Sequence, residues 1–402
     1  MRNASEHMVK KDPRPLERAG RIAAALLLLA GTVAAAPELT VAYHLDDHAA
    51  PLFDACLYPK DFSARYGLFL RQAEPRLSYS LIDGKSNTLK LRLAYCGSDS
   101  AVLAALLSGR AQVGILASED VLAAVIQGQP VRIIAPLQRA SDVLVVNRSV
   151  PARNWKEFAA WAKAQNRPVL IGYLGQYSMA ALGFAQALEC DGIIYSTTLP
   201  GSTPHSSRQG FGVGELGTKD VQLIQADDRA ELATELSYGR FDAALLQEPA
   251  ATWVSSLRGC PAIGRTDILP PGRFEDRPGT VVAATESTIA TRGDDVGRFL
   301  ELMAVATHYA NNHTRNTLAA VNLWLGLSPE LESIPLRSMG FSSRPDFSFT
   351  DGIWNWYFAL RLRNALPQNL AGYMEEKDWL GVPYDSLLLI PALDRAGARI
   401  IR

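Results

Sequence analysis

Residues 106–135 read LLSGRAQVGILASEDVLAAVIQGQPVRIIA, and residues 236–253 read LSYGRFDAALLQEPAATW. Each stretch begins with the last turn of a helical pattern that ends at a glycine, Gly109 or Gly239. A short apolar strand follows at once, and a polar pair at its carboxyl end opens another helix. Because the same helix, strand and helix recur in both halves of the chain, they predict the repeating units of a parallel α/β sheet.

The same alternation extends outward from these two stretches over most of the chain. Short β-rich runs predict strands at 39–43, 78–82, 111–116, 131–135, 142–146, 168–173, 221–225, 241–246 and 280–284. Helical patterns lie between them, at 51–66, 101–109, 119–128, 154–165, 176–189, 229–239 and 249–257. From about residue 294 the pattern is helical, so we expect a helical C-terminal tail.

Two segments interrupt the alternation. We interpret residues 83–100 as an insertion between regular elements, although apolar and polar residues alternate in LKLRLAY within them, as they do in a strand. Residues 196–219 are rich in Gly, Ser, Thr and Pro, and this composition predicts a long loop, either a lid or a plain surface connection.

Composition and charge narrow the class of protein. The 402 residues are 48% hydrophobic and 20% charged, which is typical of a globular protein of two or three domains at about 150 residues each. The 40 Lys and Arg against 41 Asp and Glu give a net charge of -1. The chain therefore lacks the basic excess with which proteins bind nucleic acid or acidic membranes.

The first 36 residues have the order of an export signal. Basic residues come first, an apolar run follows at 22–33, and three alanines end it. The basic residues are Lys10, Lys11, Arg14, Arg18 and Arg21. We expect cleavage near Ala35 and a periplasmic protein without a lipid anchor, since no Cys follows the apolar run. An uncleaved anchor or a buried helix is the alternative.

Four cysteines are widely spaced, at Cys56, Cys96, Cys190 and Cys260. No pair has the C-x-x-C spacing of zinc or thioredoxin chemistry. In an oxidising compartment they permit three disulfide pairings, and free buried thiols are the alternative. Spacing alone leaves these possibilities open.

The two quoted stretches carry a family resemblance. They resemble the periplasmic substrate-binding proteins of ABC importers for nitrate, sulfonates such as taurine, bicarbonate and the thiamine pyrimidine precursor. The residues that carry it are Gly109, Gly114, Gly128, Pro130, Val131, Gly239, Asp242, Ala243, Glu248 and Pro249. Gln112 departs from the family pattern, which has an acidic residue there. The opening AYHLDDHAAPLFDA is similar to the family's first strand and helix.

This resemblance implies an α/β fold, the two-lobed type II periplasmic binding protein fold, with the ligand in a cleft. Residues 37–140 plus 281–402 would form lobe one, and 141–280 lobe two. The crossing strands would be 142–146 and 280–284. That division favours disulfides between Cys56 and Cys96 and between Cys190 and Cys260.

Polar residues that follow strand ends are the candidate ligand contacts, because open α/β sheets bind ligands beyond the carboxyl ends of their strands. In lobe one these are His44, Asp47, His48, Ser118 and Glu119. The histidines suit an anionic ligand. Helix capping is the alternative for all five residues, and a metal site is a further one for His44, Asp47 and His48.

In lobe two the candidates come from two strand ends. Tyr173, Gly175, Gln176, Tyr177 and Ser178 follow one strand, where small residues let the backbone approach a ligand and tyrosines offer a stacking face.

Gln247 and Glu248 end the other strand, where Glu248 either meets a ligand or braces the hinge. We assign Trp354, Trp356 and Tyr357 to the core, since they recur at short helical spacing.

The resulting hypothesis is a monomeric solute receptor that delivers a small molecule to an ABC permease, with neither cofactor nor catalytic residue. A sulfonate or other small oxyanion suits the strand-to-helix junctions, and a pyrimidine suits the tyrosines. Two rivals remain: an enzyme on the same fold, such as the thiamine pyrimidine synthase, and a periplasmic sensor component.

Overall fold

The computed structural model describes residues 36–139, 142–197, 221–226, 229–326, 340–370, 372 and 374–401. Pro37–Arg402 forms one compact unit. The expected export signal and most of the expected loop at 196–219 lie outside the described residues. Within the described part of the chain, no helix has the length and apolar character needed to cross a membrane.

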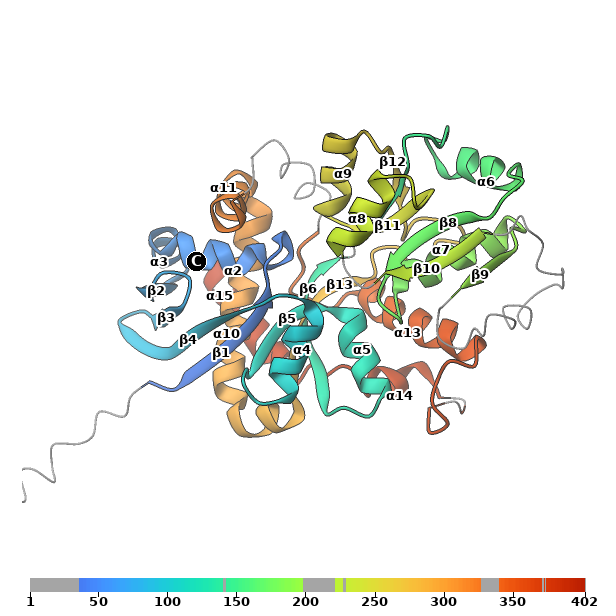
Figure 1. Ribbon diagram of the computed structural model, residues 1–402. Helices are drawn as coiled ribbons and strands as arrows, with labels where there is room; N and C mark the ends of the chain where they lie inside the picture. Colours follow the sequence, from blue (N-terminus) through green and yellow to red (C-terminus); the bar gives the residue numbers. More distant parts are fainter. Residues whose placement is uncertain are drawn as a thin grey trace, which may run out of the picture. The chain divides into compact units, whose positions relative to one another are not determined.

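Two β-sheets organise this unit (Figure 1). The first has the strand order β2-β3-β4-β1-β5-β13-β6, and the second β12-β7-β11-β8-β10-β9. The first sheet comprises β1 (Glu38–His44), β2 (Leu68–Glu74), β3 (Ser78–Asp83), β4 (Ser86–Cys96), β5 (Val113–Ala117), β6 (Val131–Arg139) and β13 (Pro278–Thr285). The second comprises β7 (Asp142–Val146), β8 (Val169–Leu174), β9 (Tyr195–Thr197), β10 (Val221–Ala226), β11 (Ala243–Gln247) and β12 (Ala262–Arg265).

Parallel pairing brings strand ends together in each sheet. In the first sheet β1 is parallel to both β4 and β5. In the second, β8 is parallel to β10 and to β11. The carboxyl ends of these parallel strands therefore lie at one edge of each sheet, where a ligand site is expected in α/β folds.

The chain crosses between the sheets twice. It leaves the first sheet after β6 and enters the second at β7, then returns from β12 to β13. The strands expected at 142–146 and 280–284 are β7 and β13, so each crossing lies just before one of them. The prediction of a two-lobed α/β periplasmic binding fold is confirmed, whereas the lobe boundaries stay a prediction.

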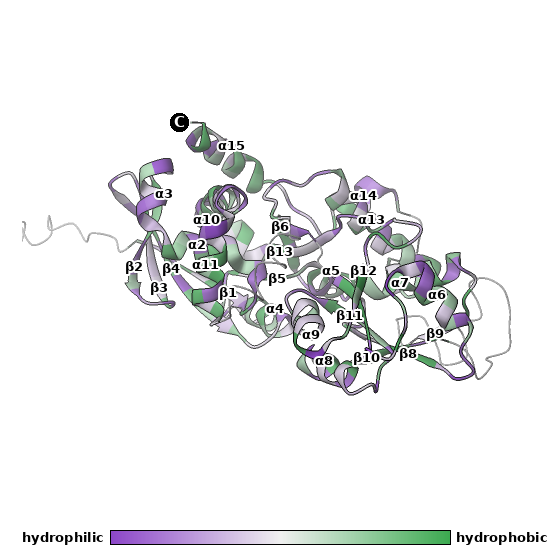
Figure 2. Cartoon of the chain, turned by 90° about the horizontal axis from the view of Figure 1, so that it is seen from above, coloured by the Kyte–Doolittle hydropathy of each residue, from purple (hydrophilic) through white to green (hydrophobic). Residues whose placement is uncertain are grey.

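Helices connect and cover the strands. They are η1 (Asp47–Ala49), α2 (Ala50–Leu57), α3 (Pro59–Tyr66), α4 (Asp99–Leu107), α5 (Ser118–Ile126), α6 (Trp155–Lys163), α7 (Met179–Cys190), α8 (Arg229–Ser237), α9 (Ala250–Arg258), α10 (Glu286–Asn312), α11 (Thr314–Leu325), α13 (Phe347–Leu362), α14 (Glu376–Leu380) and α15 (Leu389–Ile400). Figure 2 shows hydrophobic residues along the strands of the second sheet and mixed hydropathy on the helices beside them.

Two local expectations need correction. The helix expected at 51–66 is two helices, α2 and α3, because Pro59 has no N–H to continue a hydrogen-bond ladder and begins a new helix instead. Residues 86–96 are no insertion. They form β4, which pairs with both β1 and β3 inside the first sheet.

The helical tail divides between two hydrophobic clusters. Helices α10, α11 and α15 pack into the core of the first sheet. Helix α13 instead joins the cluster that contains α7 of the second sheet. Its Trp356 is fully buried and donates from Nε1 to the backbone oxygen of Tyr177 at 2.8 Å. Tyr357 stacks on Trp379 of α14 with a centroid distance of 4.4 Å.

A glycine lets α13 approach the returning crossing closely. A Cβ at Gly352 would lie 2.7 Å from Cδ of Pro278 and 3.1 Å from Cα of Arg277, closer than van der Waals contact. A Cβ at Gly397 in α15 would meet no heavy atom within 4 Å. The two positions therefore form a matched pair of helical glycines.

We expect Gly352→Ala to lower the free energy of unfolding by about 1–3 kcal/mol, because overpacking against backbone outweighs a helix-propensity gain of about 1 kcal/mol. Gly397→Ala should keep that gain and raise stability slightly. Urea denaturation measures both variants. Equal stability of the two would show that α13 does not pack against the crossing as described.

Candidate ligand-binding cavity

A cavity of about 980 Å³ lies at the carboxyl ends of strands from both sheets. Its wall includes His44 at the end of β1 and Ala117 at the end of β5. On the side of the second sheet, Leu174, Ala226 and Gln247 end β8, β10 and β11. This volume is at the upper end of the range for small-molecule sites.

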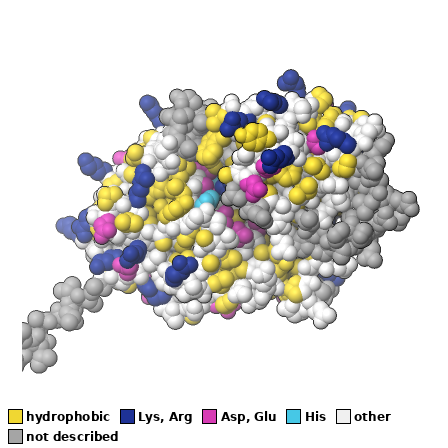
Figure 3. Space-filling model, viewed as in Figure 1, with side chains coloured by type: hydrophobic (Ala, Val, Ile, Leu, Met, Phe, Trp, Pro, Cys, Tyr) yellow, Lys and Arg dark blue, Asp and Glu magenta, His cyan; other side chains and the backbone are white. Residues whose placement is uncertain are grey.

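Helix starts place charged side chains in the cavity wall. Asp99 begins α4 two residues after Gly97, which also lines the cavity, and Glu119 and Asp120 lie in the first turn of α5. Arg229 begins α8, on the side of the second sheet. Figure 3 shows a histidine and acidic side chains gathered near the middle of this face.

The three carboxyl groups of the wall are difficult to ionise. Burial raises the pKa of Glu119 to about 8, although the positive charge of Arg277 opposes the rise. Burial raises the pKa of Asp120 to about 7, and the charge of Asp99 adds to this rise. The pKa of Asp99 is also raised, by burial and by neighbouring Asp46. The wall therefore holds carboxyl groups that lack full compensation by positive charge.

Among the described arginines of the cavity wall, Arg229 is half-buried, whereas Arg148 and Arg258 are exposed. Arg229 donates to Oε1 of Gln247 at 2.5 Å. Its nitrogens lie 3.8 Å from a carboxylate oxygen of Asp46 and 3.9 Å from one of Asp99. Since Asp46 and Asp99 belong to the first sheet's side, Arg229 links the two sides of the cavity.

Glu119 makes a second link across the cavity. Its Oε2 accepts a hydrogen bond from the backbone N–H of Met179, the first residue of α7, at 2.8 Å. Gly175 has φ of +81°, a conformation that favours glycine, and an added Cβ there would lie 3.7 Å from Oε1 of Glu119. The β8–α7 connection thus brings backbone close to this carboxyl group.

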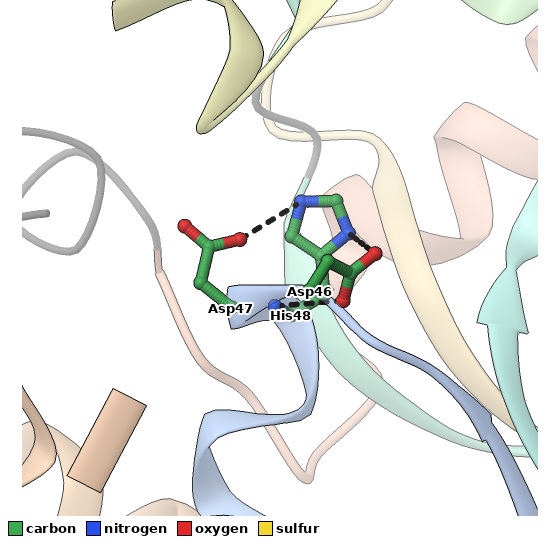
Figure 4. Close-up of side chains that lie close together, drawn as sticks. All are labelled: Asp46, Asp47 and His48. Carbon is green, nitrogen blue, oxygen red and sulfur yellow. Dashed lines mark hydrogen bonds and ion pairs between the residues drawn. The ribbon is translucent and has the colours of Figure 1, made fainter. Parts of the chain in front are cut away.

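Asp46, Asp47 and His48 form a buried cluster (Figure 4), which His44 contacts through Asp46. The ring of His48 is 3.4 Å from Asp46 through Nδ1 and 3.7 Å from Asp47 through Nε2. Burial opposes ionisation of Asp46, but His48, His44 and Arg229 outweigh it and hold its pKa well below the usual range. Asp46 also caps η1 by accepting from the N–H of His48 at 3.1 Å.

The same cluster has the donor types of a metal site. One ligand atom from each of the three residues can be chosen so that all lie within 4.8 Å of one another. Both ring nitrogens of His48 already face carboxylates, and Arg229 brings a positive charge to Asp46. The contacts shown in the cluster are thus the cap made by Asp46 and charge pairing around His48.

A family model of the NMT1-like family matches residues 34–324, which is well over half of the chain. The chain belongs to the NMT1-like family. A curated relative, an uncharacterized protein of Methanocaldococcus jannaschii, is 29% identical over 128 residues, covering 31% of this chain and 88% of that protein.

Solved structures share the fold of this NMT1-like chain. One is the zinc-bound ligand-binding component of an ABC-type import system from Staphylococcus aureus, with a TM-score of 0.60, 12% identity and coverage of 89% of this chain and 99% of that one. The alkanesulfonate-binding protein SsuA from Xanthomonas axonopodis pv. citri, bound to MOPS, has a TM-score of 0.56, 13% identity and coverage of 83% and 96%. The periplasmic nitrate-binding protein NrtA from Synechocystis PCC 6803 has a TM-score of 0.52 and 12% identity, with coverage of 91% of this chain and 91% of that one. The resemblance inferred from sequence is confirmed for family and fold.

Four of the predicted contact residues line the cavity: His44, Glu119, Gly175 and Gln247. The other eight do not. Asp47 and His48 lie in the buried cluster, and Ser118 donates to the backbone oxygen of Pro278 at 2.8 Å. Glu248 accepts from the N–H and Oγ1 of Thr252 in α9, so its carboxylate makes local contacts at the start of that helix.

The remaining predicted contact residues that do not line the cavity lie at the end of β8 and in the connection from β8 to α7. Ser178 caps α7 by accepting from the N–H of Ala181 at 3.3 Å, and the backbone of Tyr177 binds Trp356. Gln176 stands between Gly175 and Tyr177 but is outside the cavity wall. Tyr173 is fully buried in a hydrophobic cluster and is not part of the cavity wall.

Sequence reasoning missed Asp99, Asp120 and Arg229. Asp99 fell within the segment interpreted as an insertion, which concealed that it follows a strand. Arg229 follows the end of β10 at Ala226, so the rule that selected Gln247 would have found it as well.

The predicted disulfides are wrong for this structure, because all four cysteines are free. Cys190 is exposed at the end of α7, whereas Cys260 is fully buried. Cys56 belongs to the core of the first sheet, and Cys96 packs against a different cluster. Each expected pair is thus divided between different environments.

Since Tyr173 lies in the core, we expect Tyr173→Ala to lower the free energy of unfolding by about 3–5 kcal/mol, as large-to-small aromatic core substitutions do. Tyr238→Ala is the matched control, because this tyrosine is 74% exposed and should change stability by less than about 0.5 kcal/mol. Chemical denaturation followed by circular dichroism compares them. Wild-type stability of Tyr173→Ala would contradict the core assignment.

Proposed function

We propose that this protein is a periplasmic solute receptor that binds a small molecule in the cavity and delivers it to an ABC permease. The observation that carries the proposal is the cavity itself, which parallel strands of both sheets reach with their carboxyl ends. The fold supports it, since ABC import components and periplasmic binding proteins share it.

Binding requires features that this cavity has. Its volume suits a small organic molecule, and its wall combines apolar surface with a few charged groups. The sensor alternative would need a signalling partner beyond these features. A receptor requires only capture, a change of shape and release.

The two crossings supply a hinge for that change of shape. Asp142 begins the segment after the first crossing, and Arg277 ends the second crossing. The two side chains form an ion pair and are 8% and 3% exposed. Closure around 142–146 and 280–284 would bring Glu119 and Arg229 against the ligand from opposite sides, in a hinge motion typical of two-lobed receptors.

Filling the cavity tests where ligand binds. Ala230 lines the cavity on α8, so Ala230→Trp should occupy ligand space. Ala160 is exposed on α6 outside the cavity wall, and Ala160→Trp is the control. A thermal-shift screen over sulfonates, small oxyanions, pyrimidines and organic amines should find a compound that raises the melting temperature of the wild type and of Ala160→Trp only.

Two results would count against the receptor proposal. Ligand stabilisation that survives in Ala230→Trp would place the binding site elsewhere. Failure of every compound class to shift the wild type would remove the support for a solute-binding role.

The export signal is tested by mass. We propose that residues 1–36 direct export and that cleavage near Ala35 leaves a mature chain beginning at Ala36. The intact mass of the protein from a periplasmic extract should match that chain. A protein that retains Met1 and stays in the cytoplasm would contradict the periplasmic assignment.

A further inference from the structure

We propose that the ligand of this cavity carries a positively charged nitrogen group, an ammonium, amidinium or guanidinium, bound by Asp99, Glu119 and Asp120. The proposal rests on the proposed function of the cavity as a ligand site and specifies its chemistry. It departs from the sulfonate or oxyanion expected from sequence.

The first support is the distribution of charge in the cavity wall. Among the described residues, five half-buried wall residues carry an ionisable side chain. Three have carboxyl groups, one has a guanidinium and one has an imidazole: Asp99, Glu119, Asp120, Arg229 and His44. Arg148 and Arg258 also line the cavity, but both are exposed to solvent. Since exposed charges are strongly screened, the sheltered part of the wall contains more carboxyl groups than basic side chains.

The positive groups in this part already have partners. His44 is 3.2 Å from a carboxylate oxygen of Asp46 through Nδ1. Arg229 donates to Gln247 and approaches both Asp46 and Asp99. An oxyanion would compete with these partners, and once Glu119 and Asp120 ionise at higher pH it would also be repelled by their charges.

A cation would instead supply what the carboxyl groups lack. Burial raises their pKa values because the charged forms lose water without gaining full compensation. A ligand nitrogen bearing N–H groups can donate to several carboxylate oxygens at once, and such charge-assisted hydrogen bonds are the stronger kind. Ligand capture would then favour ionisation of Glu119 and Asp120.

The wall also offers groups for the rest of such a molecule. Trp253 and Tyr238 line the cavity, and aromatic faces attract organic cations. The buried Nε1 of Trp253 has no acceptor among the described residues. The wall thus combines negative charge with aromatic surface and an unused donor.

The pH dependence follows from the groups around the two carboxyls. Glu119 faces Arg277, Asp142 and Asp120, while Asp120 faces Asp99 and Arg229. Below about pH 7 both are largely protonated, so a cation must displace protons to bind. Affinity for a cation should therefore rise from about pH 6 to about pH 8 with release of protons, whereas affinity for an anion should fall.

Calorimetry with defined probes tests the inference. The cationic probes are agmatine, spermidine and benzamidine, and the anionic probes are taurine, methanesulfonate and nitrate. We expect at least one cationic probe to bind, with about tenfold or greater loss of affinity in Glu119→Gln and in Asp120→Asn. Both variants preserve side-chain volume, and the amide oxygen that Glu119→Gln introduces can still accept from the N–H of Met179. Thermal melting verifies that each is folded.

The control is Asp394→Asn, which removes an exposed carboxylate on α15 and should bind like the wild type. Binding of an anionic probe without any cationic probe overturns the inference while leaving the receptor function intact. Cation binding that neither variant weakens, or that falls as pH rises, also overturns it. If no cationic probe binds, the inference fails, and the receptor function fails only if the wider compound screen is negative too.

Discussion

The buried ion pair between Asp142 and Arg277 holds together the two places where the chain passes between the sheets. Both side chains are almost completely shielded from water. Removing either one would leave the other charge buried without a partner, which is strongly destabilising. Neighbouring contacts reinforce the junction. Thr266 binds the backbone oxygen of Asp142, and Ser118 binds that of Pro278. The arrangement of the sheets, and so the cavity between their strand ends, depends on this junction.

The same ion pair affects the pKa of a residue in the cavity wall. Arg277 lowers and Asp142 raises the pKa of Glu119, so the hinge and the cavity wall share one set of charges. Glu119 also accepts a hydrogen bond from the start of α7 on the other side. A ligand that changes the ionisation of Glu119 would therefore act on the hinge and on the contact between the two sides together. Capture and movement would then be parts of one electrostatic event.

Sequence patterns predicted the strand ends well, because short apolar runs bounded by Gly and polar residues mark them locally. They could not predict which way a residue in a fully buried strand points. Tyr173 lies in β8, whose faces are both covered, so alternation gives no solvent side to choose. Asp99 was missed because it follows β4, and the place of β4 inside the sheet depends on its pairing with β1, about 50 residues earlier in the chain. Cysteine pairing failed for a related reason, since each expected pair divides between separate environments that spacing does not reveal.

Helix α13 connects two parts of the fold that are far apart in the sequence. It touches the returning crossing at Gly352 and the start of α7 through Trp356, although it lies far along the chain from both. Any rotation of the second sheet must slide α7 along this helix or carry the helix away from Pro278. A movement of the second sheet relative to the crossing would therefore have to break or rearrange at least one of these two contacts. The C-terminal helices thus fasten the returning crossing to the layer beside α7, although they come last in the chain.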